Sequence, residues 1–221
     1  MSMSQVNRRA FVRSALAGVA VAGMLATVSL SWAADEAPDA LVQRLSNDVL
    51  QTAQSDKQVQ SGDIQHMMAL VDSKIMPYVN FTRMTAAATG PAWRRATAGQ
   101  RQQLQQEFKT LLVRTYAGAL KRVSNQTIDV LPMRSAPGDK EVLVRTLVKG
   151  RGDPVQIDYR MEQTTGPTAG WKIYDMNVMG VWLVDTYRPQ FAQEINASGI
   201  DGLINVLAER NKANAAAPAR G

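Results

Sequence analysis

The stretch Val155-Gln-Ile-Asp-Tyr-Arg-Met-Glu162 decides the fold, because apolar and polar residues alternate along its whole length. A period of two residues is typical of a β-strand with one face buried. Similar alternation predicts strands over residues 126–133, 141–149 and 171–178. The connections between these segments are short, so we expect a four-stranded antiparallel meander.

The segments before and after the predicted strands have apolar residues at helical spacing. We expect helices after Pro38, from Ile64 to just before Pro77, after the capping residue Asn80, after a capping box at Thr97-Ala-Gly-Gln100, and on both sides of Gly199, with Asp201 capping the last one. The polar residues 55–62 are predicted to form a loop. Helices packed on one face of an antiparallel sheet define the α+β class.

The composition excludes several classes of protein. Of the 221 residues, 45% are hydrophobic and 20% are charged, which is too apolar for a disordered chain. The chain has no cysteine and one histidine, His66, which excludes a disulfide scaffold, a cysteine nucleophile and a multi-histidine metal site. The basic residues are scattered among acidic ones, so a nucleic-acid-binding face is also excluded. We expect no cofactor.

The first 33 residues have the pattern of an export signal. A polar start with Arg8, Arg9 and Arg13 precedes an uncharged run over residues 15–30, and Ser31-Trp32-Ala33 provides a cleavage site. Residues 7–13 also resemble the twin-arginine export motif, and a general secretory signal is the alternative. We expect a signal at 1–33, one domain at 34–211 and a disordered tail at 212–221, with the mature protein outside the cytoplasm.

Six segments of the mature chain resemble, in this order, the MlaC family of periplasmic phospholipid-binding proteins. They are residues 75–84, 93–97, 108–116, 155–160, 171–175 and 200–204, and the similarity extends from about residue 42 to 211. Four positions depart from the family's pattern. Asn80 replaces a usual Asp, Met179 a usual Glu and Trp182 a common Ser, and Pro189 interrupts a segment that normally reads Tyr-Arg-Ser-Gln-Phe.

The resemblance implies a sheet wrapped by helices, of the nuclear-transport-factor-like type, with an apolar cavity for the acyl chains of a phospholipid. It further implies a periplasmic carrier that exchanges diacyl phospholipid with two membrane partners. These are an inner-membrane ABC transporter complex with an MCE protein, and an outer-membrane lipoprotein–porin complex. Such a system maintains the lipid asymmetry of the outer membrane, and the carrier needs no catalytic residue.

Candidate lipid-contacting residues come from the apolar face of the strands, from the long helix and from the segment after the last strand. They are Leu112, Tyr116, Val142, Val144, Thr146, Val155, Ile157, Tyr159, Met161, Val178, Val181 and Val184. Ordinary core packing without a ligand is the alternative for each of them.

Two other functions fit the same scaffold, since a fold alone does not determine function. A secreted isomerase or hydrolase would need an ionisable group in the cavity, for which Asp158 and Asp175 are the candidate acid and base. The alternation places Asp158 on the polar face beside Arg160, so we expect a solvated charge there instead. The third possibility is an adaptor domain with a filled core that binds only protein partners.

Overall fold

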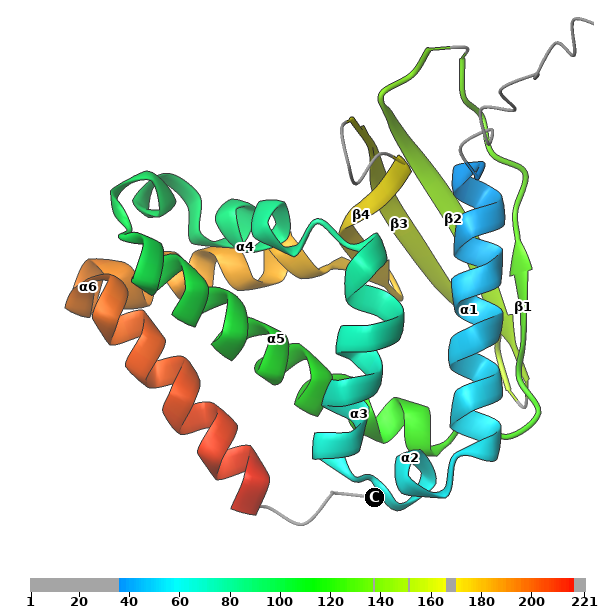
Figure 1. Ribbon diagram of the computed structural model, residues 1–221, viewed down its shortest axis with the longest axis horizontal. Helices are drawn as coiled ribbons and strands as arrows, with labels where there is room; N and C mark the ends of the chain where they lie inside the picture. The colour runs from blue at the N-terminus through cyan, green and yellow to red at the C-terminus, as the bar shows by residue number, and fades with distance from the viewer. Residues whose placement is uncertain (1–35, 137, 151, 166–169, 217–221) are drawn as a thin grey trace, which may run out of the picture. The chain divides into compact units, whose positions relative to one another are not determined.

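The computed structural model describes residues 36–216, except 137, 151 and 166–169. The predicted export signal and residues 217–221 lie outside the described residues. Within the described part, six α-helices accompany a five-stranded sheet (Figure 1). The predicted α+β class is therefore confirmed.

The elements follow the chain as helices, then strands, then a last broken helix. The helices are α1 (Pro38–Ser55), α2 (Lys57–Ser61), α3 (Ile64–Leu70), the π-helix η1 (Val71–Ile75), the 3₁₀ helix η2 (Met76–Tyr78), α4 (Phe81–Thr89), the 3₁₀ helix η3 (Gly90–Arg95), α5 (Ala98–Lys121) and α6 (Leu183–Ala216). The strands are β1 (Thr127–Val130), β2 (Glu141–Lys149), β3 (Val155–Thr164), β4 (Gly170–Val178) and β5 (Val181–Trp182).

The sheet is an antiparallel meander in the order β1-β2-β3-β4-β5. The four predicted strands are all present, although β1 is shorter than the predicted segment 126–133. The prediction of four strands is wrong, because Val181 and Trp182 pair with the end of β4 and add a fifth strand at the edge. A strand of two residues is too short to show an alternating pattern.

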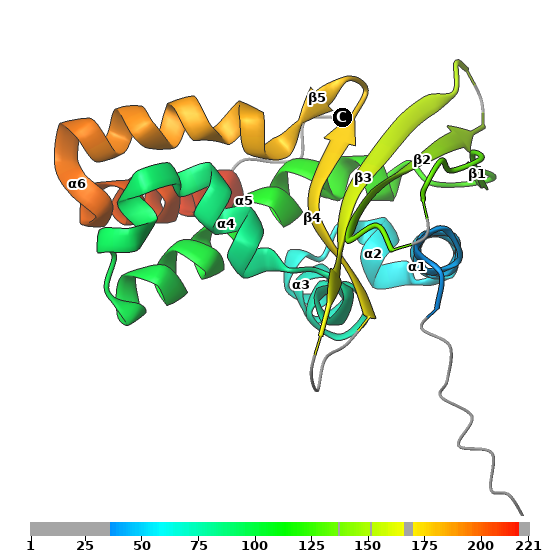
Figure 2. The same ribbon diagram turned by 90° about the horizontal axis from the view of Figure 1, so that it is seen from above.

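One face of the sheet, called here the inner face, is apolar and carries the first core. Val142 and Val144 of β2 pair with Met161 and Tyr159 of β3, and each of these side chains is at most 9% exposed. They pack against α1, which lies beside β1 at this edge of the sheet (Figure 2). The side chains that α1 contributes are Leu41, Val42 and Leu45.

The second core lies among α4, α5 and α6. Phe108 of α5 is fully buried, and its ring centroid lies 5.6 Å from Phe81 of α4 and 5.0 Å and 5.2 Å from Tyr187 and Phe191 of α6. The two contacts with α6 are edge-to-face, an arrangement that aromatic rings favour. Gly199 breaks α6 at the predicted position with a φ of 72°, which glycine adopts without steric cost.

The predicted caps of α4 and α5 are both present. The side-chain oxygen of Asn80 accepts a hydrogen bond of 3.0 Å from the backbone N–H of Arg83. Thr97 and Gln100 form the reciprocal capping box, with hydrogen bonds of 3.2 Å and 3.0 Å. These helix starts were predictable because a cap involves residues only three positions apart.

Three segments differ from the prediction. The expected loop at 55–62 contains α2, because the carboxylate of Asp56 accepts two backbone N–H groups and caps a short helix. The helix expected to stop before Pro77 continues through η1 and η2, where Pro77 occupies an early position that needs no N–H donor. Finally, α6 extends to Ala216, so the described part of the expected tail at 212–221 is helical.

The outer face of the sheet is polar, but it is not freely solvated. Asp158 is only 8% exposed, and its carboxylate accepts hydrogen bonds of 2.9 Å and 3.1 Å from the amide of Gln156. Its cross-strand neighbours are Arg145 and Asn177. The prediction of a solvated Asp158 is therefore wrong, because neighbouring polar side chains cover the carboxylate.

Arg83 fastens α4 to this outer face. Its guanidinium donates to Glu141 at 2.7 Å and to Glu162, and it stacks on the ring of Tyr174 at 3.6 Å from the centroid. Glu141 and Glu162 lie directly opposite each other on β2 and β3, where two like charges would repel without the arginine. Hydrogen bonds from Arg83 and Tyr174 hold the pKa of Glu141 below its usual value.

Replacing Arg83 by alanine is expected to lower the free energy of unfolding by about 1–2 kcal/mol at neutral pH. A carboxylate whose folded pKa is depressed stabilises the fold above its unfolded pKa, and this contribution is lost as pH falls through the folded pKa. The difference between wild type and R83A should therefore shrink below about pH 4. Urea unfolding at about pH 7 and pH 3 measures this difference in the free energy of unfolding, and R94A, which changes an exposed arginine, is the control. A difference that does not change with pH would contradict this explanation.

Candidate functional site

The two cores meet at Val79, which packs against both the sheet cluster and the helical cluster. At the periphery of both clusters, several apolar side chains are only half-buried. We call the seam the set of Met76, Val79, Leu112, Ile157, Met176 and Tyr187. Because half-buried apolar side chains still expose surface to water, an apolar ligand could add contacts there.

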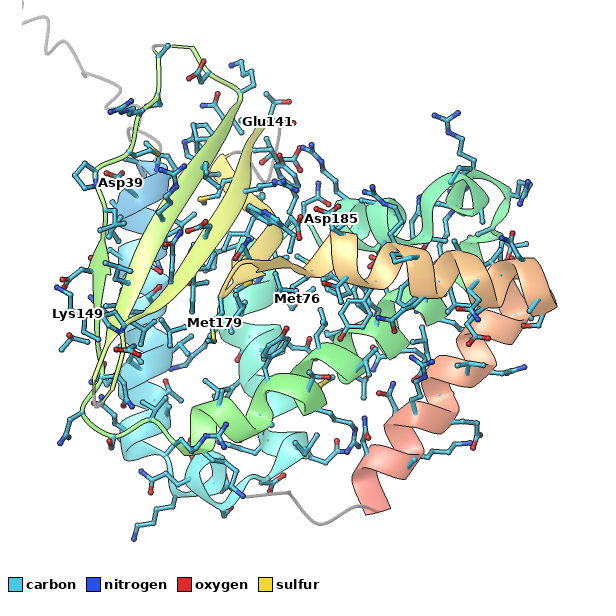
Figure 3. The ribbon with its side chains drawn as sticks, turned by 180° about the vertical axis from the view of Figure 1, so that it is seen from behind. Asp39, Met76, Glu141, Lys149, Met179 and Asp185 are labelled. Carbon is cyan, nitrogen blue, oxygen red and sulfur yellow. The ribbon has the colours of Figure 1, made fainter. Side chains whose placement is uncertain are left out.

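The long helix α5 and the strands pack largely on other elements rather than on each other. This helix packs mainly on α6, α3, α2 and α4, and the strands pack chiefly on α1, α4 and α6. Figure 3 shows the side of the molecule on which the strands and α5 face each other, with Met76 and Met179 labelled between them. Within the described residues, the long helix and the strands therefore pack on other elements more than on each other.

Across the inner face, one row of cross-strand neighbours becomes steadily more exposed toward the edge. Thr146 pairs with Ile157, Ile157 with Val178, and Val178 with Val181. Thr146 is fully buried, Ile157 and Val178 are half-buried, and Val181 is 51% exposed. This row, called here the cross-strand row, is largely apolar and leads from the sheet edge to the interior.

Tyrosines give the helical side of the seam a weakly polar character. Tyr116 lies one turn after Leu112 on α5, and Tyr187 of α6 faces the same region. Burial raises the pKa of Tyr116, and the neighbouring Tyr187 acts in the same direction. Burial also raises the pKa of Tyr187. Both phenols are therefore neutral at ordinary pH and add no charge to the apolar surface.

The twelve predicted lipid-contacting residues fall into different environments. Val142, Val144, Thr146, Tyr159 and Met161 are buried on the inner face. Leu112, Tyr116, Val155, Ile157 and Val178 are half-buried, and Val181 is exposed. Val184 is buried in the helical cluster, apart from the buried valines of the sheet. Leu112 packs on the helical cluster and Ile157 on the sheet cluster, and the fully buried residues form the core.

Sequence reasoning missed four residues of the seam. Met76, Val79, Met176 and Tyr187 were not among the candidates, although each is half-buried at the junction. Met176 had a usable signal, since it lies two positions before Val178 and shares its face of β4. Met76 and Val79 have no local signal, because the path of η2 between the two cores depends on tertiary packing.

Two cavities of the described residues lie away from the seam. An apolar cavity of about 40 Å³ lies within a third cluster between α1, α3, η1 and α5, with Ala53, Met67, Val71 and Leu120 among its lining residues. A pocket of about 280 Å³ lies at the polar surface around Gln126 and Lys149. The first is far smaller than the 300 Å³ or more typical of ligand sites, and the second has the wrong polarity for acyl chains.

Asp175 is a structural carboxylate beside the site. It is 1% exposed, and it pairs with Arg160 at 3.0 Å while accepting backbone N–H groups of Met176 and Val184 at 2.9 Å and 3.2 Å. Burial raises the pKa of Asp175, whereas the two N–H groups and Arg160 oppose that rise. Arg160 in turn stacks on Trp182 at 3.7 Å. All these groups hold β4, β5 and the start of α6 together.

The described residues contain no group of three or more His, Asp or Glu side chains that could hold a metal ion. Among the helices of residues 36–216, with the gaps given above, none has both the length and the apolar character that a bilayer span requires.

Known proteins with similar sequence or structure point to one family. The family model described as MlaC protein matches residues 43–209. The intermembrane phospholipid transport system binding protein MlaC of Haemophilus influenzae is 23% identical over 175 residues, which cover 79% of this chain and 82% of that protein. The toluene tolerance protein ttg2D of Pseudomonas putida is 24% identical over 179 residues, covering 80% of this chain and 82% of that protein.

A solved structure extends this similarity to three dimensions. It is a phospholipid-binding protein from Ralstonia solanacearum in complex with a phospholipid. This protein is 45% identical in sequence, with a TM-score of 0.77, and the match covers 82% of this chain and 99% of that one. Since the family model spans most of the chain, the chain belongs to the MlaC family.

Proposed function

We propose that this protein is a phospholipid carrier that holds acyl chains in the seam between the sheet and α5. The observation that carries the proposal is the 45% identity with a structure solved with a bound phospholipid. The half-buried residues of the seam support it, because they are apolar surface that a ligand can cover. The nuclear-transport-factor-like cavity implied by the family resemblance would then form there as the two clusters move apart around the chains.

The energetics of transfer fit a carrier. Two acyl chains contain about 30 methylenes, and hiding each from water contributes about 0.8 kcal/mol, or roughly 25 kcal/mol in total. That sum exceeds the binding free energies that proteins reach. The donor, however, is a membrane in which the chains are already dry, so the apolar contribution largely cancels. The protein therefore supplies solubility during transit, and no catalytic step is required.

The same proposal includes the location and the partners. The export-signal pattern of residues 1–33, cleaved after Ala33, supports a periplasmic mature protein with its lipid-binding domain at 34–211. We propose that it exchanges diacyl phospholipid with an inner-membrane ABC transporter complex that bears an MCE protein. Its other partner would be an outer-membrane lipoprotein–porin complex, and the exchange would maintain outer-membrane asymmetry.

Native mass spectrometry of protein purified from a bacterial periplasm tests this function. The expected spectrum shows the mature chain with bound diacyl phospholipid, which denaturation then releases intact. Lipid-free protein with a solid core would instead support an adaptor that binds only proteins. Lysophospholipid and free fatty acid in place of intact lipid would indicate an enzyme.

A further inference from the structure

The turn between β4 and β5 carries an unfavourable residue at its tip. Val178 pairs with Val181, so Met179 and Gly180 form a two-residue hairpin turn. Their φ angles are 54° and 86°, both in the left-handed region. A turn with two positive φ angles favours Asn, Asp or Gly at its first position, because a side chain such as that of Met clashes with its own backbone there. The sequence therefore keeps a strained residue where a relaxed one would fit.

The same turn also exposes large apolar side chains to solvent. Among the residues that the structure describes, Met179 and Val181 are the large hydrophobic side chains that are exposed, at 72% and 51%. The backbone N–H of Gly180 donates a hydrogen bond of 2.8 Å to the side-chain oxygen of Asn177. The hairpin would thus be both more stable and more soluble with a polar residue at 179. The sequence therefore opposes local stability through the strained φ of Met179 and lowers solubility through the two exposed apolar side chains.

The position of the turn explains what the apolar tip could contact. Val181 is the exposed end of the cross-strand row, which continues through Val178 to Ile157 in the seam. The backbone N–H of Met179 donates to the carbonyl of Gln156 at 3.1 Å, which holds the tip beside the start of β3. An acyl chain that follows this row stays on apolar surface from solvent to seam, and Met179 lies at its outer end.

We propose that Met179 and Val181 form a loading rim, over which the acyl chains of a phospholipid pass into and out of the seam. The occupant is the lipid chain itself during transfer, rather than a bound protein. The rim covers chain surface that would otherwise meet water while the lipid is between membrane and seam. It thereby lowers the barrier to transfer without changing how much lipid the filled protein holds. This inference rests on the proposed carrier function.

The variant Met179→Asn separates this role from a structural one. Asn followed by Gly suits a turn with two positive φ angles, so M179N should melt about 2–4 °C higher than wild type. Phospholipid uptake by delipidated M179N should nevertheless be about fivefold to tenfold slower, because the variant loses most of the apolar surface at the tip. A residue that only shapes the turn would not make stability and uptake change in opposite directions.

The uptake experiment uses vesicles of phosphatidylethanolamine and phosphatidylglycerol that contain a trace of pyrene-labelled phospholipid. Stopped-flow fluorescence follows transfer to wild type, M179N and the matched control Met179→Leu, which keeps both the apolar side chain and the strained φ. We expect M179L to match wild type in rate and melting temperature. The lipid-to-protein ratio after purification from the periplasm should be equal in all three.

Several outcomes would overturn the loading rim. If M179N takes up lipid at the wild-type rate while wild type carries phospholipid, the rim is wrong and the carrier function stands. If wild type carries no phospholipid, both the loading rim and the carrier function are wrong. If wild type forms a dimer that M179N does not form, the tip is a contact between two copies and not a path for lipid.

Discussion

Replacing Ile157 by glutamate is expected to reduce the phospholipid retained after purification to less than about a tenth of the wild-type ratio. Ile157 is half-buried in the cross-strand row, between Thr146 and Val178. In the lipid-free protein a carboxylate at this position can still reach water. When acyl chains fill the seam they remove that water, and an unpaired charge then becomes very unfavourable. The substitution therefore penalises the loaded state more than the fold.

A charge added elsewhere on β3 provides the matched control. Gln163 lies on the same strand, and its side-chain oxygen accepts a hydrogen bond of 3.0 Å from Lys140. Q163E should convert this contact into an ion pair and leave lipid content unchanged. Phospholipid phosphorus per mole of protein measures the ratio, and circular dichroism verifies that each variant is folded. A folded I157E with the wild-type ratio would show that acyl chains do not lie along this row.

Replacing Asp175 by alanine should produce the largest loss of stability, about 2–4 kcal/mol. The change removes the acceptor of two backbone N–H groups, at Met176 and Val184, in a place that water hardly reaches. It also removes the partner of Arg160, although that side chain is 38% exposed and can be partly solvated. Because Val184 lies in the first turn of α6, the connection between this helix and β4 should loosen first.

Urea unfolding of D175A measures this loss, with D185A as the control. Asp185 is in the same helical turn as Val184, but it is exposed, and its contact with Arg188 is long at 3.8 Å. We expect D185A to lie within about 0.5 kcal/mol of wild type. Equal losses in the two variants would mean that burial and the backbone N–H groups do not account for the role of Asp175.

Features that depend on neighbours in the sequence were predictable. The alternation at 155–162 located β3, and the side chains of Asn80 and Thr97 located the starts of α4 and α5. Gly199 marked the break in α6. The order of strands also followed, because short connections force consecutive strands to pair. The sequence alone therefore determined the class and the meander.

The candidate site was predicted only in part. Alternation correctly placed Ile157 and Val178 on the inner face, but it could not separate them from the buried Val144 and Met161 on the same face of the sheet. A period of two gives the direction of a side chain and not the element that covers it. The difference arises because Val144 and Met161 lie in the cluster that α1 covers, whereas Ile157 lies at the periphery of that cluster.

The sequence by itself determined the elements, their caps and the apolar face of the sheet, since each depends on contacts within a few residues. Only the tertiary structure decided which apolar residues remain half-exposed, how Val79 joins the two clusters, and that Asp158 and Asp175 are buried. These properties depend on the packing of segments distant in the chain, and side-chain burial is set by that packing rather than by local pattern.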